Sequence, residues 1–322
     1  MEFDFPIEEL RKYRPEVTEP EDFDGFWTDA ISQARKLGRA TSFDQTDPGL
    51  PLVEAWDVSF SGHGGDAIKA WLIMPKNREG RLPAIVEYIG YGGGRSLPHD
   101  WLSWACAGYA HFVMDCRGQG SNWSVGDTPD PSDTGTPAVP GFMTRGIEKP
   151  ESYYYVRLFV DAVRAIDAVR EFEGVDPTRV IVNGGSQGGG LGLAAAGLAE
   201  IQGVMCDTPF LAHFRRAVKI TSEYPYGEIV EYGKFHRDQL PAVFNTLSYV
   251  DVVNHAKRAT CPALFSVGLT DMVTPPSTVF AAYNWYGGPK QIEVYEFNGH
   301  EGGGTHHHRL KLAFAREVFG SS

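Results

Sequence analysis

Residues 179–199, RVIVNGGSQGGGLGLAAAGLA, decide the fold. The stretch opens with RVIVNG, whose β-branched side chains favour a short strand. It closes with LGLAAAGLA at 191–199, whose small and apolar residues predict a helix that packs closely against its neighbours. Between the two stands GGSQG at 184–188. A G-x-S-x-G motif between a strand and a helix is typical of a nucleophile elbow.

An elbow of this kind requires small residues on both sides of the nucleophile, and Gly184 and Gly188 meet this requirement. The turn would raise the Ser186 hydroxyl above the edge of a sheet, beside the free N–H groups at the start of the helix. Two alternatives are a Gly-rich turn with an incidental serine and a phosphate-binding loop. The second lacks the Lys-Ser/Thr of a P-loop and lies late in the chain. We therefore interpret Ser186 as a nucleophile.

Outward from this motif, strand-like and helical segments alternate. The expected strands are 83–90, 109–115, 179–184, 203–209, 262–268 and 291–297, and the expected helices are 101–108, 152–174, 191–199 and 308–320. Such alternation predicts a mostly parallel sheet with helices on both faces, and the elbow motif within it is typical of the α/β-hydrolase fold. Runs 53–60 and 66–74 flank SGHGG and predict an antiparallel hairpin that starts the sheet.

We expect one α/β-hydrolase domain over residues 1–322. An N-terminal extension with helical pieces covers 1–50, and a helical segment rich in aromatic residues at 210–260 is read as an insertion. The Gly/Pro/Asp-rich stretch 117–150 is expected to be mostly loop. The helix over 152–174 carries one apolar stripe, formed by Val156, Phe159, Val160, Val163, Ile166, Val169 and Phe172.

Composition excludes several classes of function. The 322 residues are 42% hydrophobic, as in globular proteins, and the 29 basic and 41 acidic residues give a net charge of −12. Without a basic patch or run, neither nucleic acid nor an anionic membrane surface is an expected partner. No apolar run reaches 18 residues, and the start MEFDFPIEELRKY lacks the apolar core of a signal peptide.

Four cysteines are scattered without a C-x-x-C motif. The cysteines are Cys106, Cys116, Cys206 and Cys261, and the first three lie among apolar residues and are expected to be buried free thiols. The chain therefore shows no disulfide framework, which favours the cytoplasm.

A nucleophilic serine requires a base and a group that orients the base. Seven histidines follow Ser186, and His300, in FNGHEGGG, stands between the last expected strand and the last expected helix. The order of residues in α/β-hydrolases places the acid between serine and histidine. Asp271, directly after the strand 262–268, is the favoured acid, and Asp207, at the end of 203–209, is its rival.

Two backbone N–H groups are expected to form an oxyanion hole. One belongs to Gln187, the residue after the nucleophile. The other belongs to Tyr91, in the loop GYGGGR at 90–95, where glycines allow close approach of the backbone. A flexible linker is the alternative interpretation of that loop.

No metal site and no cofactor are expected. His306, His307 and His308 are consecutive, and three consecutive helical residues do not share a face. The chain also lacks H-E-x-x-H and any Cys/His cluster with the spacing of metal ligands.

Three motifs together resemble the cephalosporin-C deacetylase and acetyl xylan esterase family, carbohydrate esterase family seven. They are D-x-R-G-Q-G (Asp115, Arg117, Gly118, Gln119, Gly120), GGSQGG around Ser186, and GHE at 299–301. The resemblance implies removal of acetyl groups from small oxygen esters, such as acetylated xylo-oligosaccharides and cephalosporins. It assigns the triad to Ser186, Asp271 and His300, the oxyanion donors to the Tyr91 and Gln187 backbones, and a scaffold role to Arg117 and Gln119.

The resemblance further implies an intracellular homo-hexamer, whose active sites face an internal cavity and admit only small substrates. Two alternatives remain open: an α/β-hydrolase that cleaves another acyl bond, as a peptidase or thioesterase does, and a catalytically silent protein on the same fold. The presence of serine, aspartate and histidine at all three positions argues against a silent protein.

Overall fold

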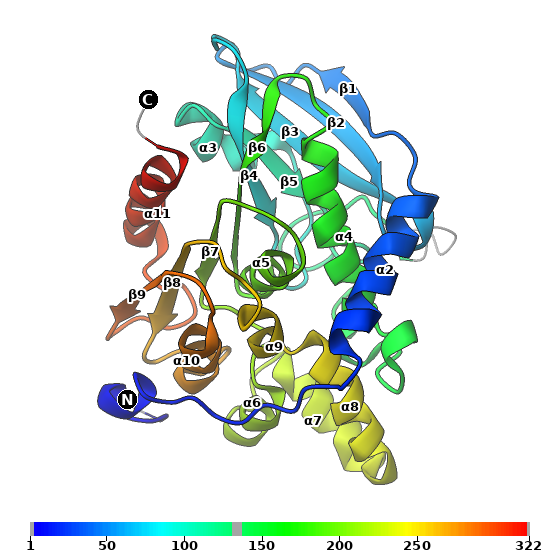
Figure 1. The fold of residues 1–322 in the computed structure, drawn as a ribbon, viewed down its shortest axis with the longest axis vertical. Helices are drawn as coiled ribbons and strands as arrows, with labels where there is room; N and C mark the ends of the chain where they lie inside the picture. Colours follow the sequence, from blue (N-terminus) through cyan, green and yellow to red (C-terminus); the bar gives the residue numbers. More distant parts are fainter. Residues whose placement is uncertain (1–2, 131–136, 321–322) are drawn as a thin grey trace.

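The computed structural model describes residues 3–130 and 137–320, and its central feature is one nine-stranded sheet (Figure 1). The strand order is β1-β2-β3-β5-β4-β6-β7-β8-β9. The strands are β1 (Ser42–Thr46), β2 (Val53–Ser61), β3 (Ala67–Pro75), β4 (Leu82–Tyr88), β5 (Ala110–Met114), β6 (Val175–Gly185), β7 (Gly203–Asp207), β8 (Ala263–Gly268) and β9 (Lys290–Tyr295).

The sheet is antiparallel at one end and parallel through the rest. β1, β2 and β3 pair antiparallel, and β3 also pairs antiparallel with β5. From β5 to β9 every neighbouring pair is parallel. The predicted hairpin is confirmed, and its turn holds Gly64 and Gly65 at φ angles of 67° and 82°, which glycine adopts without strain.

Helices cover both faces of the sheet, which confirms the predicted α/β-hydrolase architecture (Figure 1). On one face lie α3 (Leu102–Cys106) and α11 (Gly304–Phe319), which bury a separate apolar cluster with the strands beneath them. On the other face lie α4 (Tyr154–Val169), α5 (Gln187–Leu198) and α10 (Pro276–Trp285), with α9 (Val252–Ala256) packed beside α5 and α10. The larger core cluster lies on this second face.

Helix α4 buries the predicted apolar stripe from Val156 to Val169, although Phe172 lies beyond the end of the helix, and nearly all its other sides are buried as well. The reason is a second layer: α2 (Phe23–Leu37) packs over α4, and the Trp27 and Phe159 rings stack at 5.6 Å between centroids. Polar residues of α4 are buried as ion pairs and hydrogen bonds, as with Asp161 and Arg164. Sequence periodicity reports one buried face and cannot show that another helix covers the opposite face.

The N-terminal extension contains the expected helical pieces, α1 (Ile7–Leu10) and α2, and also the strand β1, which sequence analysis missed. β1 reads SFDQT and is largely exposed, so it carries almost no apolar alternation. The extension runs along the molecule below α10 and α9 (Figure 1). Asn284 Nδ2 donates to the carbonyls of Leu10 and Tyr13 at 2.9 and 2.7 Å, which fastens this segment to α10.

The interruption at 210–260 is helical, as predicted. It contains α6 (Phe214–Ile220), α7 (Tyr226–Phe235), α8 (Leu240–Val250) and α9. Within 117–150 the described residues are mostly irregular, apart from short helical turns such as Phe142–Thr144. Residues 131–136 of that predicted loop lie outside the described residues.

Two of the three cysteine predictions are confirmed and one is wrong. Cys116 and Cys206 are buried, whereas Cys106 is exposed. Helix α3 is a short helix at the surface. Trp104 and Ala105 face the sheet, and Cys106 lies on the outer side of the last turn.

A buried histidine makes stability depend on pH. The His255 ring packs 5.0 Å from Phe23 and 5.2 Å from Trp27 between centroids, and burial lowers the pKa of His255 to about 3. Its ordinary pKa in the unfolded chain is about 6.5. Between these values the unfolded state binds one more proton than the folded state. His255 therefore contributes full stability above pH 6.5, and this stability is lost as pH falls towards 3, at about 1.4 kcal/mol per pH unit.

We expect His255→Gln to remove this pH-dependent contribution to the free energy of unfolding. Glutamine retains a donor for the Tyr249 carbonyl, which accepts from His255 Nε2 at 3.1 Å. Urea unfolding at pH 7.5 and pH 5.5 should show the variant losing about 1.4 kcal/mol less than the wild type over this interval. Equal losses in the two proteins would contradict the assignment.

Candidate active site

The candidate residues all follow strands at one edge of the sheet. Tyr91 follows β4, Ser186 follows β6, Asp271 follows β8 and His300 follows β9. These strands are parallel, so their carboxyl ends meet at the same edge, where ligands bind in open α/β sheets.

Ser186 stands in a strained turn between β6 and α5. Its φ and ψ are 55° and −120°, a region that non-glycine residues rarely adopt. Neighbouring backbone holds it there: Ser186 N donates to the Asp207 carbonyl and Phe210 N donates to the Ser186 carbonyl, both at 2.9 Å. A Cβ on Gly188 would lie 2.0 Å from the Tyr88 carbonyl oxygen, and one on Gly184 would lie 2.4 Å from the carbonyl carbon of Gly188. Only glycine fits at either position.

Asp271 and His300 are hydrogen bonded to each other. His300 Nδ1 lies 2.9 Å from Asp271 Oδ2. The Asp271 carboxylate is fully buried, whereas about a third of the His300 side chain is exposed. The backbone N–H groups of Val273 and Thr274 donate to Asp271 Oδ1 at 2.8 and 3.0 Å, and the Thr274 hydroxyl donates to Oδ2 at 2.7 Å. These donors fix the carboxylate, and the contact at Nδ1 leaves His300 Nε2 available to a substrate or a nucleophile.

The rival acid Asp207 is directed to the other face of the sheet. Its carboxylate contacts Lys311 Nζ at 2.5 Å and His307 Nε2 at 3.2 Å, and both partners lie on α11. Burial alone would raise the pKa of Asp207, but these two partners lower it. Asp207 contributes to the candidate site only through its backbone carbonyl, which anchors Ser186.

One side chain joins the two loops expected to form the oxyanion hole. Gln119 Oε1 accepts from Gly92 N at 2.6 Å, and Gln119 Nε2 donates to Gln187 Oε1 at 2.8 Å. The Gln187 side chain is fully buried and also accepts from the Tyr155 hydroxyl at 3.0 Å. The Tyr91 and Gln187 backbones are therefore connected through a buried network of amides.

Trp123 braces the Tyr91 loop from outside. Its Nε1 donates to the Tyr91 carbonyl at 2.8 Å, and its ring occupies the space where a Cβ on Gly93 would be, 2.2 Å from the nearest ring carbon. The glycine-rich loop is thus packed and hydrogen bonded, which contradicts the alternative of a flexible linker.

Arg117 is fully buried and bound by acidic side chains. Its guanidinium pairs with Asp161 through Nε at 2.5 Å and Nη2 at 2.8 Å, and with Asp66 and Asp130 through Nη1 at 3.0 and 3.3 Å. Gly118 and Gly120 follow with φ angles of 70° and 102°, and a Cβ on Gly120 would lie 2.1 Å from Gly126 N. These contacts fit the scaffold role that the family resemblance implies.

Loss of the Arg117 charge should destabilise the fold strongly. Arg117→Met leaves the fully buried Asp161 carboxylate without its cation, which we expect to lower the free energy of unfolding by about 3–5 kcal/mol. Arg35→Met is the matched control, because Arg35 pairs with Asp167 at 2.9 Å while half exposed, and its loss should cost about 0–1 kcal/mol. Urea unfolding of both variants checks the prediction, and equal losses would contradict it.

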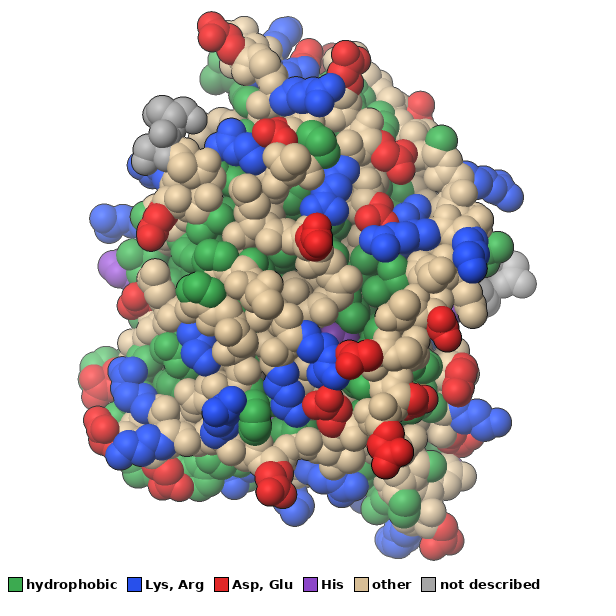
Figure 2. All heavy atoms as spheres, in the orientation of Figure 1, with side chains coloured by type: hydrophobic (Ala, Val, Ile, Leu, Met, Phe, Trp, Pro, Cys, Tyr) green, Lys and Arg blue, Asp and Glu red, His purple; other side chains and the backbone are tan. Residues whose placement is uncertain are grey.

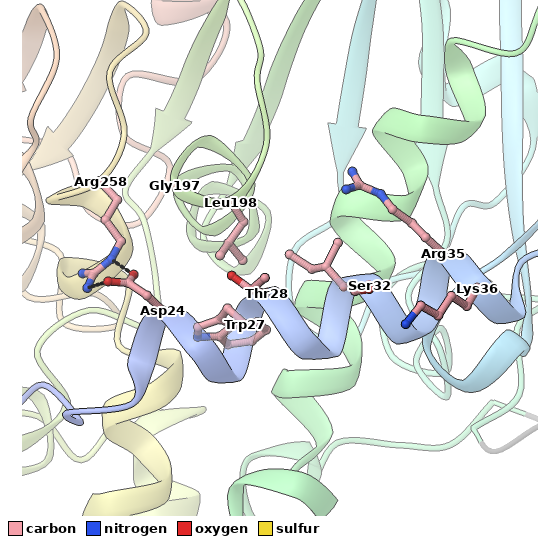
Figure 3. Close-up of a pocket in the computed structure, with 10 residues that line it drawn as sticks. Asp24, Trp27, Thr28, Ser32, Arg35, Lys36, Gly197, Leu198 and Arg258 are labelled. Atoms are coloured by element: carbon pink, nitrogen blue, oxygen red, sulfur yellow. Dashed lines mark hydrogen bonds and ion pairs between the residues drawn. The ribbon is translucent and has the colours of Figure 1, made fainter.

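A separate hollow of about 560 Å³ lies between α2 and the end of α5 (Figure 3). It is far along α5 from Ser186, because Gly197 and Leu198 line it whereas Ser186 precedes the first turn. Two of its cations are already engaged: Arg258 pairs with Asp24, and Arg35 pairs with Asp167. Figure 2 shows acidic and basic side chains interspersed over one face of the molecule rather than gathered by sign.

The consecutive histidines point to different partners. His307 Nδ1 lies 3.0 Å from the Tyr295 hydroxyl, and His308 Nε2 lies 2.6 Å from Ser103 Oγ. Over residues 3–130 and 137–320, no three His, Cys, Asp or Glu side chains are grouped as metal ligands would be. Within the same residues no helix is both long and apolar enough to cross a membrane.

Sequence analysis missed three residues that support the site. Thr274 stands next to the Pro275-Pro276 pair and binds the Asp271 carboxylate, and Thr208 Oγ1 donates to the His300 carbonyl at 3.3 Å. Glu228 binds the Tyr91 hydroxyl. Thr274 could be found from its position in the acid loop. Glu228 carries no local signal, because its partner is 137 residues away in the chain.

A mostly parallel sheet with a strained serine after β6 and an Asp–His pair after β8 and β9 defines the class of α/β-hydrolases. Within this class the chain belongs to the acetyl xylan esterase family, because the family model described as acetyl xylan esterase (AXE1) matches residues 1–318.

Solved structures of two relatives are similar over nearly their whole length. An acetyl xylan esterase from a Paenibacillus species is 39% identical, with a TM-score of 0.90, and the alignment covers 97% of this chain and 99% of that one. Acetyl xylan esterase 1 from a Thermoanaerobacterium species is 34% identical, with a TM-score of 0.89 and coverage of 98% and 100%.

A curated relative is longer than this chain. Acetyl esterase Axe7A from Xylanibacter ruminicola is 28% identical over 294 residues, which are 89% of this chain but only 65% of Axe7A. The acylaminoacyl peptidase of Pyrococcus horikoshii is 16% identical with a TM-score of 0.61, and this likeness shows the fold alone.

Proposed function

We propose that this chain is a serine esterase that removes acetyl groups from small oxygen esters through an acyl-enzyme. Ser186 is the nucleophile, His300 the base and Asp271 the acid that orients the base. The observation that carries the proposal is the 2.9 Å contact between Asp271 and His300 at the sheet edge that also presents Ser186 in its strained turn. Membership of the acetyl xylan esterase family supports the choice of an acetyl ester.

The geometry supports a two-step mechanism. His300 Nε2 takes the proton from Ser186 Oγ as this oxygen attacks the acetyl carbonyl, and Asp271 stabilises the imidazolium through Nδ1. His300 then protonates the leaving alcohol. In the second step His300 activates a water molecule that attacks the acetyl-enzyme and releases acetate. No step requires a cofactor or a metal.

The backbone N–H groups of Tyr91 and Gln187 would bind the oxyanion in both steps. Gln187 is the first residue of α5, so its N–H is among those that a helix leaves without an internal partner. The Gln119 amide ties both loops together, which holds the two donors in place before the substrate arrives. Donors that are already in position stabilise the charge that develops in the transition state.

We further propose that the substrates are acetylated xylo-oligosaccharides and the acetyl ester of cephalosporin C. We also propose an intracellular homo-hexamer whose inner cavity admits only small molecules. Support comes from the family resemblance, and for acetyl xylan from the names of the Paenibacillus and Thermoanaerobacterium relatives. Sedimentation of the purified protein tests the assembly, and a clean monomer would overturn the hexamer.

A series of 4-nitrophenyl esters from acetate to octanoate tests the reaction. We expect the initial rate to be highest on the acetate and to fall steeply with chain length, because a pocket built for acetyl excludes longer acyl chains. Sugar acetates and cephalosporin C are the next substrates. A flat profile, or a preference for octanoate, would contradict an acetyl esterase. Cleavage of amides or thioesters in preference to acetate would favour the less supported alternative, a peptidase or thioesterase.

A further inference from the structure

The Tyr91 side chain is held by a cluster far from its own loop in sequence. Its hydroxyl donates to Glu228 Oε1 and accepts from the N–H groups of Gly141 and Phe142, each at 3.0 Å. The second oxygen of Glu228, Oε2, accepts from Met143 N at 3.0 Å. One carboxylate thus fixes both the Tyr91 hydroxyl and the 141–143 turn.

Glu228 lies on α7, within the helical segment 210–260 that interrupts the strand-helix alternation. Glu228 is only 9% exposed, and burial raises the pKa of its carboxyl group. A buried carboxylate is costly unless donors satisfy its oxygens. Here the donors are the Tyr91 hydroxyl and the Met143 N–H, so the position of Glu228 is set by the same contacts that hold Tyr91.

Tyr91 is therefore held at both ends. At the backbone, Trp123 binds the Tyr91 carbonyl and Gln119 binds the next N–H, that of Gly92. At the far end of the ring, Glu228 binds the hydroxyl. The ring between them packs against Phe142, 5.6 Å between centroids. A rigid aromatic side chain fixed at its tip transmits a shift of the tip to its own backbone.

We propose that Glu228 is a positioning residue for the oxyanion hole: through the Tyr91 hydroxyl it sets the place of the Tyr91 backbone N–H. Helix α7 then belongs to the catalytic apparatus rather than to a passive insertion. The inference rests on the proposed function, in which the Tyr91 N–H binds the oxyanion. Glu228 lies outside the elements that carry the triad, and its effect is indirect.

Three variants test the link: Glu228→Gln, Tyr91→Phe and the double variant. Glutamine has nearly the same size but only one acceptor oxygen. It therefore cannot accept from both the Tyr91 hydroxyl and the Met143 N–H as the two oxygens of Glu228 do. Phenylalanine removes the hydroxyl and keeps the ring. Each single variant should lower kcat on 4-nitrophenyl acetate about tenfold or more with KM changed by less than about twofold, because a misplaced donor weakens transition-state binding specifically. If the two residues act as a unit, the double variant should lose no more than either single variant.

Glu231→Gln is the matched control. Glu231 lies on the same helix, is exposed and pairs with Lys234 at 3.3 Å, so its kcat should stay within about twofold of the wild type. All assays are run well below the melting temperature of each variant. Losses that multiply in the double variant, or a Glu228→Gln variant that melts earlier but keeps full kcat, would overturn the proposal. If Glu228→Gln does not fold, Tyr91→Phe decides alone: unchanged kcat overturns the link.

The assay of the unmodified protein separates this failure from failure of the proposed function. An active wild type with an inactive Ser186→Ala establishes the serine esterase whatever the Glu228 variants do. A wild type without serine-dependent activity on any ester removes the proposed function, and the Glu228 inference with it.

Discussion

Ser186→Ala should lower kcat on 4-nitrophenyl acetate by at least about a thousandfold. The side chain it truncates is the only protein group in the proposed mechanism that forms a bond to the acetyl carbon. The triad acts as a unit, so His300 and Asp271 cannot compensate for the missing oxygen. The remaining rate would come from direct attack of water on the ester, with the oxyanion still stabilised by the backbone donors. Initial rates with purified wild type and variant at the same concentration measure the effect.

The fold should tolerate this change, which makes the kinetic result clear. Alanine also has to adopt the φ of 55° found at Ser186, so the variant keeps a similar backbone strain. Ser103→Ala is the control, since Ser103 lies on α3, on the other face of the sheet, and contacts His308 rather than the candidate site. Retention of most activity by Ser186→Ala, or an equal loss in the control, would rule out Ser186 as the nucleophile.

The sequence predicts those parts of the fold whose signals are local. Strand β6, the turn at Ser186 and helix α5 are adjacent in the chain, and composition alone marks each of them. The short strand β1 was not predicted, because it is exposed and its pairing with β2 is decided by tertiary contact. Helix α4 was expected over 152–174 and spans Tyr154–Val169, and the burial of its outer side depends on α2, which lies more than a hundred residues earlier.

The candidate site divides in the same way. Chain order placed Asp271 and His300 after the last two strands, and the structure brings these two side chains into contact. Their catalytic roles, and those of Tyr91 and Gln187, stay predictions. Order alone could not exclude Asp207, because its partners Lys311 and His307 lie about a hundred residues later, on α11. Gln119 is a second example. The D-x-R-G-Q-G motif marks its position in the sequence, but only the fold shows that it joins the Tyr91 loop to Gln187.

Asp271→Asn should lower kcat by about three to four orders of magnitude with little change in KM. Asparagine would present either an amide NH₂ or a single carbonyl oxygen to His300 Nδ1. The amide nitrogen would impose the wrong tautomer on the imidazole. The carbonyl would not stabilise the imidazolium that forms when Ser186 loses its proton. When the amide nitrogen faces His300, the asparagine oxygen still accepts from the Val273 and Thr274 N–H groups, which favours this orientation and keeps the loop in place. Steady-state kinetics with 4-nitrophenyl acetate measures the loss.

Asp207→Asn is the matched comparison, because both residues are aspartates at the carboxyl ends of neighbouring strands, and Asp207, 20% exposed at its side chain, has different partners from the fully buried Asp271. The Asp207 carboxylate contacts Lys311 and His307 on α11. Loss of its charge leaves the Lys311 ammonium without this ion pair and should lower the free energy of unfolding. The Asp207 backbone carbonyl still anchors Ser186, so kcat of the folded variant should fall far less than in Asp271→Asn. A larger loss of kcat from Asp207→Asn would reverse the assignment of the acid. The two variants therefore separate a carboxylate that serves the reaction from one that holds α11 against the sheet.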